Sequence, residues 1–307
     1  MRRRYVTADV FTDTLFKGNP VAVILDAAGL STTQMQAVAV EFNYSETTFV
    51  LPPRDPAHTA WVRIFTPSRE VPFAGHPNIG TAFVLAGQVA ASGKGTSHRF
   101  VFEEEAGLIP VNLLCEGGAV VGAELTVPQP LSRRALVPAE RAAACLCLTA
   151  QDIQTDAHEP QVISVGLPFL VVELASRDAL RRARPDRAAY DGLLPLDGAT
   201  AVYAYTREIG AAEAGTDLQA RMFTPRMTED PATGSATSAV TALIAELQGG
   251  GAVNLRVGQG VDMGRSSLLL TRTHNQGGAE MTFVGGRCVT AFEGSFFLAG
   301  EDGDAAG

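Results

Sequence analysis

The segment Arg63-Ile64-Phe65-Thr66-Pro67 recurs as Arg221-Met222-Phe223-Thr224-Pro225, and this internal repeat constrains the fold more than any other feature. Each copy leads through a glycine, Gly75 or Gly234, into an apolar segment with helical character. A one-residue insertion changes the offset between the copies from 158 to 159. Such a repeat predicts two related halves, and a chain of 307 residues exceeds what one hydrophobic core usually serves. We therefore expect two domains.

The two glycines stand just before predicted helix starts, where a residue without a side chain lets another molecule approach the backbone. The first N–H groups of a helix have no internal partner and carry the positive end of its dipole. Two such starts that face each other across a cleft would bind a small anion. The repeat thus predicts a small-molecule site beside Gly75 and Gly234.

Composition narrows the class of partner. The net charge of −9 opposes nonspecific binding to nucleic acid or to an anionic membrane surface. The four cysteines fit neither a disulfide framework nor a zinc spacing, and no apolar run approaches the roughly 18 residues of a membrane span. We expect a cytoplasmic protein with a small-molecule partner, no nucleic acid and no membrane.

Two local clusters receive structural interpretations. Cys145 and Cys147 lie two apart in a predicted helix at residues 139–148, where they do not share a face, so we interpret them as buried thiols rather than a metal or redox pair. Five arginines between residues 177 and 187 are interpreted as a solvated helix face, with RNA binding as the alternative.

Hydrophobic periodicity and turn residues predict a mixed α+β chain. Expected helices are 32–42, 77–88, 139–148, 178–184 and 236–247. Expected strands are 5–11, 20–25, 47–51, 61–65, 99–103, 109–114, 123–127, 162–165, 169–173, 201–206, 254–257 and 267–272. Segments 280–284 and 287–297, around Gly285-Gly286, are predicted to form a hairpin that extends a sheet. We expect one domain from residues 1–118 with 279–300, a second from 119–278, and a disordered tail at 301–307.

Several polar residues could carry chemistry, and each also has an ordinary structural interpretation. Glu46 stands between a helix end and a strand, where a solvated glutamate is common. His76 is expected at or near an N-cap, with Pro77 at the first helical position; a neutral His76 would bind a substrate oxygen or merely cap the helix. Asp230 is a good turn former, and Ser235 is a candidate cap.

In combination, these motifs resemble the PhzF-like phenazine biosynthesis family of isomerases over almost the whole chain. The resemblance rests on Asn43-Tyr44-Ser45-Glu46-Thr47-Thr48-Phe49-Val50, the segment 63–67 with Pro72-Phe73-Ala74-Gly75-His76-Pro77, Glu229-Asp230-Pro231-Ala232-Thr233-Gly234-Ser235-Ala236, and, in the same order, Asp9-Val10-Phe11-Thr12, Gly18-Asn19-Pro20 and Gln259-Gly260 with Met263-Gly264-Arg265. It implies an α+β, diaminopimelate-epimerase-like fold of two pseudo-symmetric domains. Each would be a curved sheet around a central helix, with the active site between them. It also implies a homodimer and no cofactor.

The resemblance assigns roles by position. Glu46 matches the family's catalytic acid/base, and His76 and Asp230 match polar residues of its catalytic site. The implied substrate-binding residues are Gly75, Pro77, Asn78, Gly234, Ser235 and Ala236. Asn78 stands where threonine is usual, and Arg265-Ser266 where Arg-Pro is usual, which leaves the substrate open.

The expected activity is that of a cofactor-independent isomerase in which Glu46 moves a proton between carbons of a small carboxylated substrate, dihydro-hydroxyanthranilate-like by analogy. An amino-acid racemase or epimerase is one alternative. It would need acid/base groups on both faces of one carbon, and only Glu46 and Asp230 could serve, because no cysteine lies in either motif. A noncatalytic small-molecule-binding protein of the same fold is the other alternative.

Overall fold

The computed structural model describes residues 2–93, 97–127, 129–276 and 279–298, and the chain divides into two compact units. The first comprises Met1–Phe16, Pro20–Ala123 and Arg287–Gly307, and the second comprises Lys17–Asn19 and Glu124–Gly286. These bounds differ from the expected ones because two strands, β8 and β17, each continue from one unit into the other. The expected tail at 301–307 lies outside the described residues.

The described residues of the first unit form two helices and most of the strands up to β8. Its elements are β1 (Arg2–Val10), β2 (Asn19–Ile24), α1 (Thr32–Phe42), β3 (Glu46–Leu51), β4 (Ala60–Phe65), β5 (Glu70–Val71), α2 (Gly75–Ala91), β6 (Arg99–Glu104), β7 (Gly107–Glu116) and the first part of β8 (Ala119–Thr126). Strand β17 (Ala279–Phe297) returns to this unit, where it pairs with β1.

The second unit begins within β8 and ends within β17. Its elements are β9 (Ser132–Leu136), α3 (Ala139–Cys145), η1 (Ala150–Asp152), β10 (Gln161–Ser164), β11 (Pro168–Glu173), α4 (Arg177–Arg182), α5 (Arg187–Asp191), β12 (Val202–Thr206), η2 (Ala211–Glu213), β13 (Leu218–Phe223), β14 (Glu229–Asp230), α6 (Gly234–Leu247), β15 (Asn254–Gln259) and β16 (Ser267–Gln276).

The two units share one scheme of strand pairing. In the first, β2–β3 is parallel, β3–β4 and β4–β5 are antiparallel, β4–β6 is parallel and β6–β7 is antiparallel. In the second, β11–β12, β12–β13, β13–β14, β13–β15 and β15–β16 repeat the same senses in the same order. Both copies of the repeated arginine also hold a glutamate of the next strand at 2.7 Å, Arg63 with Glu70 and Arg221 with Glu229. The sequence repeat is therefore a structural duplication.

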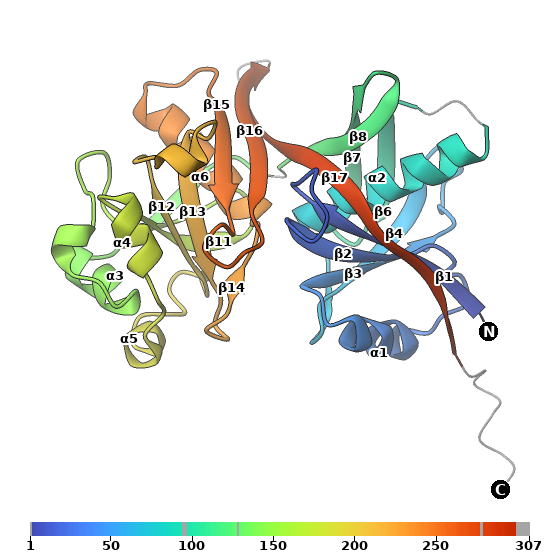
Figure 1. The fold of residues 1–307 in the computed structure, drawn as a ribbon, viewed down its shortest axis with the longest axis horizontal. Helices are drawn as coiled ribbons and strands as arrows, with labels where there is room; N and C mark the ends of the chain where they lie inside the picture. The colour runs from blue at the N-terminus through green and yellow to red at the C-terminus, as the bar shows by residue number, and fades with distance from the viewer. Residues whose placement is uncertain (1, 94–96, 128, 277–278, 299–307) are drawn as a thin grey trace, which may run out of the picture. The chain divides into compact units, whose positions relative to one another are not determined.

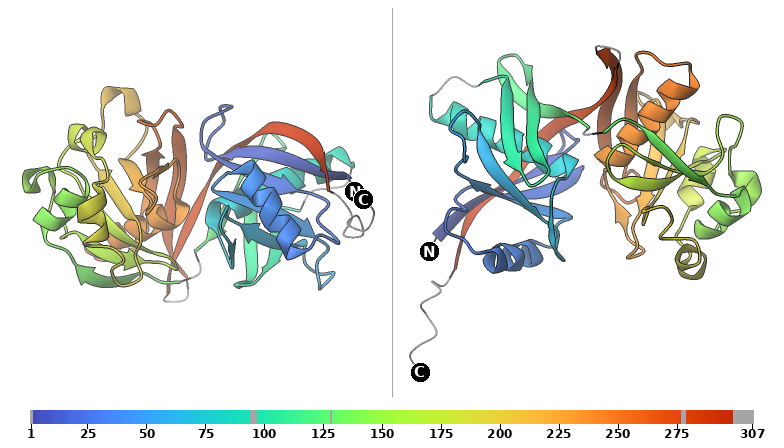
Figure 2. Two further views of the ribbon diagram at one scale, coloured as in Figure 1. Left: turned by 90° about the horizontal axis from the view of Figure 1, so that it is seen from below. Right: turned by 180° about the vertical axis from the view of Figure 1, so that it is seen from behind.

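Each unit packs its sheet around one central helix. Helix α2 contacts β1, β3 and β7, and α6 contacts β10, β11, β15 and β16; Figure 2 shows α6, in orange, lying against strands of its own unit. The opposite face of each sheet is covered by the smaller helices, with Phe65 packed beside α1 residues and Phe223 beside residues of α3 to α5. The chain thus has the expected mixed α+β architecture.

The predicted hairpin around Gly285-Gly286 is wrong. Strand β17 runs through both glycines without a break and appears as one long red strand in Figure 1. Gly285 pairs with Leu270 of β16, and Cys288 pairs with Val10 of β1. Two adjacent glycines favour a turn only when nothing holds the backbone extended; here each half of the strand has its own pairing partner.

Two side-chain interpretations also need correction. Helix α3 ends at Cys145, so Cys147 lies beyond it with φ 53° and is exposed rather than buried. Arg177 is not on a solvated face, since it is 6% exposed and its guanidinium contacts Asp262 at 2.9 Å and Glu213 at 3.1 Å. Spacing alone did not show that acidic partners distant in sequence would cover this arginine.

Candidate functional site

In the first unit, the structure brings Glu46 and His76 together. Helix α1 ends at Phe42 and is capped by Asn43, a left-handed residue with φ 52°, and β3 then begins at Glu46 itself. Glu46 Oε2 lies 3.4 Å from His76 Nδ1 on the first turn of α2. The Glu46 side chain is 20% exposed and that of His76 is 7% exposed, so a small molecule can reach the carboxyl while the imidazole stays largely covered.

His76 is neutral at physiological pH. Burial lowers its pKa to about 4, and a hydrogen bond with the Pro20 backbone opposes that shift only in part. Nε2 is buried and has no hydrogen-bond partner in the described part of the chain, whereas Nδ1 faces the carboxyl of Glu46. A neutral imidazole has one donor and one acceptor nitrogen, so Nδ1 can take either role toward the Glu46 carboxyl.

Helix α2 starts without a side-chain cap. Its N-cap is Ala74, and His76 and Pro77 are its second and third residues, not the N-cap and first residue that the sequence suggested. By contrast, Ser31 and Gln34 form a capping box at the start of α1. The N–H groups of Gly75 and His76 therefore lack a side-chain acceptor of the usual kind, which leaves them suited to an anion.

In the second unit, Asp230 is held by a buried polar network. Its Oδ1 accepts a hydrogen bond from Asn19 Nδ2 at 3.0 Å, and its Oδ2 accepts one from Thr233 Oγ1 at 2.5 Å. Gln259 donates from Nε2 to the Asp230 carbonyl at 2.8 Å and to Thr233 Oγ1 at 3.0 Å. Both carboxylate oxygens of Asp230 thus act as acceptors in a fixed orientation.

Helix α6 also starts at its motif glycine without a side-chain cap. Thr233 is the N-cap, and Ser235 is the second helical residue rather than the cap. The side chain of Ala236 is fully buried, as is that of Asn78 in α2, so neither meets solvent. Their expected part in substrate binding would therefore depend on backbone N–H groups or on a rearrangement of the side chain.

Sequence reasoning did not identify three residues of these regions as functional. Gln259 and Asn19 belonged to recognised motifs, but nothing local showed that they reach Asp230. Glu104 was hidden in the run Glu103-Glu104-Glu105, which looks like a solvated strand end. A signal was nevertheless present, because Glu104 lies two residues after Phe102 and four after Phe100. On a strand this spacing places all three on one face, which the two phenylalanines predict to be buried.

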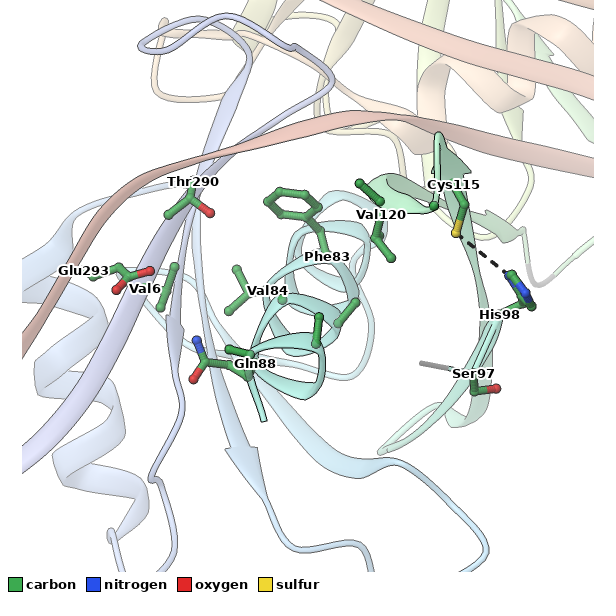
Figure 3. A pocket seen from close by; sticks show the side chains of 16 residues that line it. Val6, Phe83, Val84, Gln88, Ser97, His98, Cys115, Val120, Thr290 and Glu293 are labelled. Atoms are coloured by element: carbon green, nitrogen blue, oxygen red, sulfur yellow. Dashed lines mark hydrogen bonds between the residues drawn. The ribbon is translucent and has the colours of Figure 1, made fainter. Parts of the chain in front are cut away.

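A cavity of about 620 Å³ in the first unit lies away from Glu46 and His76. It follows the C-terminal half of α2 from Phe83 to Ala91, and Figure 3 shows Phe83, Val84 and Val120 along its wall. At its rim, Cys115 Sγ lies 3.8 Å from His98 Nδ1. Because α2 is 17 residues long, this cavity and the first turn of the helix are at opposite ends of it.

The described ranges contain neither a metal-binding cluster nor a membrane-spanning helix. Histidine, cysteine, aspartate and glutamate side chains nowhere gather there in threes in a way that would hold a metal ion. Among the same residues, every helix is too short or too polar to cross a membrane.

Comparison with known proteins supplies a family. A model of phenazine biosynthesis-like proteins, PhzC-PhzF, matches residues 8–294. An uncharacterized isomerase of Mesorhizobium japonicum is 38% identical over 308 residues, covering 96% of this chain and 99% of that protein. The trans-2,3-dihydro-3-hydroxyanthranilate isomerase of Pseudomonas fluorescens is 35% identical, with 96% and 99% covered. The solved structure of a predicted epimerase from Pseudomonas aeruginosa aligns with a TM-score of 0.76 at 28% identity, covering 97% of this chain and 100% of that one. The epimerase-like fold expected from the sequence is confirmed.

Proposed function

Because this chain belongs to the PhzC-PhzF family of phenazine biosynthesis-like isomerases, we propose that it moves a proton between two carbons of a small carboxylated substrate, with Glu46 as both acid and base. The observation that carries the assignment is the pairing of a partly exposed Glu46 with a buried, neutral His76 at 3.4 Å. A neutral imidazole can orient a carboxyl group in either of its protonation states, which an obligate cation could not do equally well.

The proton balance is simple. Glu46, as a carboxylate, takes a proton from a substrate carbon; the electron pair of that C–H bond shifts into the conjugated system. The resulting carboxylic acid returns the proton to another carbon of the same system. Substrate and product are isomers, so no oxidant, reductant or group acceptor takes part.

The other motif residues have binding roles in this proposal. Within the first unit, the uncapped N–H groups at the start of α2 suit a substrate carboxylate, and His76 keeps the Glu46 carboxyl in position. Asp230 suits a donor group of the substrate, because Asn19 and Thr233 already fix it as an acceptor. This favours a one-base reaction over inversion by two bases, which would need Asp230 to exchange protons freely.

A Glu46→Gln variant tests the central assignment. With trans-2,3-dihydro-3-hydroxyanthranilate as the first substrate offered, kcat should fall by roughly 10²- to 10⁴-fold, the usual contribution of a general acid/base, while KM changes little. The glutamine keeps the shape of the side chain but cannot accept the proton. Turnover near the wild-type rate would remove Glu46 as the base, and a change in KM alone would indicate a positioning role.

Failure of the wild-type protein to convert this compound would bear on substrate identity and not on Glu46. Other carboxylated metabolites would then be screened by thermal shift, in which a ligand at about 100 times its Kd adds roughly 2.7 kcal/mol of stability. The homodimer and the cytoplasmic location expected from the resemblance remain predictions; sedimentation of the purified chain tests the first.

A further inference from the structure

The last residues of β6 and β15 hold corresponding positions in the two units. In the first unit, the parallel pairing of β4 with β6 aligns Trp61 with Glu103. In the second, the parallel pairing of β13 with β15 aligns Gln219 with Gly258. Trp61 and Gln219 each stand two residues before the repeated arginine, so the residues that follow their partners, the ends of β6 and β15, correspond as well.

Gln259, at the end of β15, holds the turn that leads into α6. Besides its bonds to the Asp230 carbonyl and Thr233 Oγ1, its Oε1 accepts a hydrogen bond from the Thr233 backbone N–H at 3.1 Å. The side chain is fully buried. A single amide therefore fixes both the aspartate and the N-cap residue of the helix.

Glu104, at the end of β6, stands in the matching place beside α2. It is 8% exposed and lies on the same face of the strand as the buried Phe100 and Phe102. Its neighbour is the amide of Asn78, on the first turn of α2 and itself fully buried. The contact between the two falls short of full hydrogen-bond geometry, and their polar atoms have no other partner among the described residues.

The surroundings of Glu104 favour its neutral form. Burial raises its pKa to about 8, and the Asn78 amide offsets that rise only in part; no charged group contributes to the shift. Across a cavity of about 360 Å³ that Glu104 also borders, His58 and Glu103 are paired with each other at 2.9 Å. The remaining ionisable groups of the adjoining segments, including β6 itself and its partner β7, are Arg54, Asp55, Arg63, Glu70, His76, Arg99, Glu105, Cys115 and Glu116.

On the basis of the proposed function, we propose that Glu104 is a positioning residue which, as a neutral carboxyl, does in the first unit what Gln259 does in the second. A neutral Glu104 can donate its O–H to Asn78 Oδ1 and accept from Asn78 Nδ2, as a carboxamide would. Asn78 lies on the turn that carries Gly75 and His76, so holding Asn78 holds the imidazole against Glu46. An ionised Glu104 can only accept, and it would repel the Asn78 oxygen.

The decisive variant is Glu104→Gln, which places the residue of the second unit in the first. At pH 7 its kcat should equal that of the wild-type protein. Between pH 7 and pH 9, wild-type kcat should fall about tenfold as the O–H donor is lost, whereas the variant should show no such decline. An equal alkaline decline in both proteins would contradict the role given to Glu104.

A second readout needs no substrate and so remains valid if the proposed reaction is wrong. The ¹⁵N shifts of the His76 imidazole should move with a midpoint near pH 8 in the wild-type protein, separately from the titration of the ring itself near pH 4. The step should be absent from Glu104→Gln. A step of equal size in the variant, or none in either protein, would overturn the inference.

Glu104→Leu separates positioning from packing. It preserves side-chain bulk but leaves Asn78 without a partner, so kcat should fall about tenfold or more at pH 7 with little change in KM, and glutamine at the same position should restore it. If the leucine variant does not fold, Asn78→Thr serves instead, since threonine is the corresponding residue, Thr237, of α6. Wild-type kcat and an unchanged His76 spectrum in the variant tested would show that Glu104 and Asn78 only pack.

Discussion

The starts of α2 and α6 occupy corresponding positions in the duplicated fold but differ in how their buried polar groups are hydrogen-bonded. Beside α6, the side chain of Gln259 is engaged at both its oxygen and its nitrogen, and Asp230 is held at both carboxylate oxygens. Beside α2, buried atoms of His76, Asn78 and Glu104 lack hydrogen-bond partners in the ranges the structure describes. Such atoms cost about 1–3 kcal/mol each when nothing satisfies them. The α6 start is built as a fixed platform, whereas the α2 start keeps the groups that can exchange protons or meet a ligand.

The proposed acid/base, Glu46, also has no counterpart of its kind in the second unit. Phe65 pairs with Thr47, and its repeat mate Phe223 pairs with Val202, so the residue before Val202, Ala201, corresponds to Glu46. The second unit thus has a buried alanine where the first has its carboxyl. Duplication supplied two equivalent places, and only one of them carries a base. A one-base reaction is what such an asymmetry would support.

The largest effect on stability should come from breaking the platform of the second unit. The side chain of Gln259 is fully buried. Gln259→Leu removes the oxygen that accepts from the Thr233 N–H and the nitrogen that donates to the Asp230 carbonyl. At about 1–3 kcal/mol for each buried group left unpaired, we expect the free energy of unfolding to fall by roughly 2–6 kcal/mol. Urea unfolding of the two proteins measures it. A loss below about 1 kcal/mol would mean that water replaces the amide and that the platform is not rigid.

These same residues show which features of the fold and of the candidate site could be predicted from the sequence. The repeat predicted that β4 leads to α2 and β13 to α6, because strand, turn and helix start are contiguous in each copy. It did not reveal the correspondence of Glu104 with Gln259, since that depends on parallel pairing between strands separated by a whole helix. Glu46 and His76 were paired through family resemblance, and spacing alone would not have joined them. The misassigned Gly285-Gly286 turn shows the reverse error, in which local turn chemistry was overruled by two pairing partners.

The next largest effect concerns stability in acid. Ser235 of α6 corresponds to His76 of α2, so His76→Ser introduces the residue of the second unit. His76 has a folded pKa of about 4 against an ordinary value of 6.5, so between these values the unfolded chain binds the proton and the folded chain does not. Stability from this group is therefore present above pH 6.5 and is lost as the pH falls toward 4, by about 3 kcal/mol in all. In His76→Ser this contribution should be missing.

The comparison uses the slope of stability against pH and not its absolute value, because the serine also leaves a space in the core. Thermal unfolding of both proteins at several values between pH 4 and pH 7 supplies the two curves. Parallel curves would show that His76 has nearly the same pKa in the folded protein as in the unfolded chain, so burial would not keep its imidazole neutral below pH 6.5.

The smallest effects should come from exchanging the small residues that let the two central helices approach their strands. With the offset of 159, Gly80 of α2 corresponds to Ala239 of α6. A methyl group added at Gly80 would overlap the side chain of Val21 and lie 2.9 Å from Val10 Cγ2. Gly80→Ala should therefore cost about 1–3 kcal/mol through overpacking, despite the better helix propensity of alanine.

Ala239→Gly should cost only about 1 kcal/mol, mainly from the propensity of glycine in a helix interior. The same pair of residues thus changes in opposite directions, and both changes destabilise. If Gly80→Ala proves stabilising, β1 and β2 yield to the added methyl group, and the close approach of α2 to its sheet is not what requires glycine there.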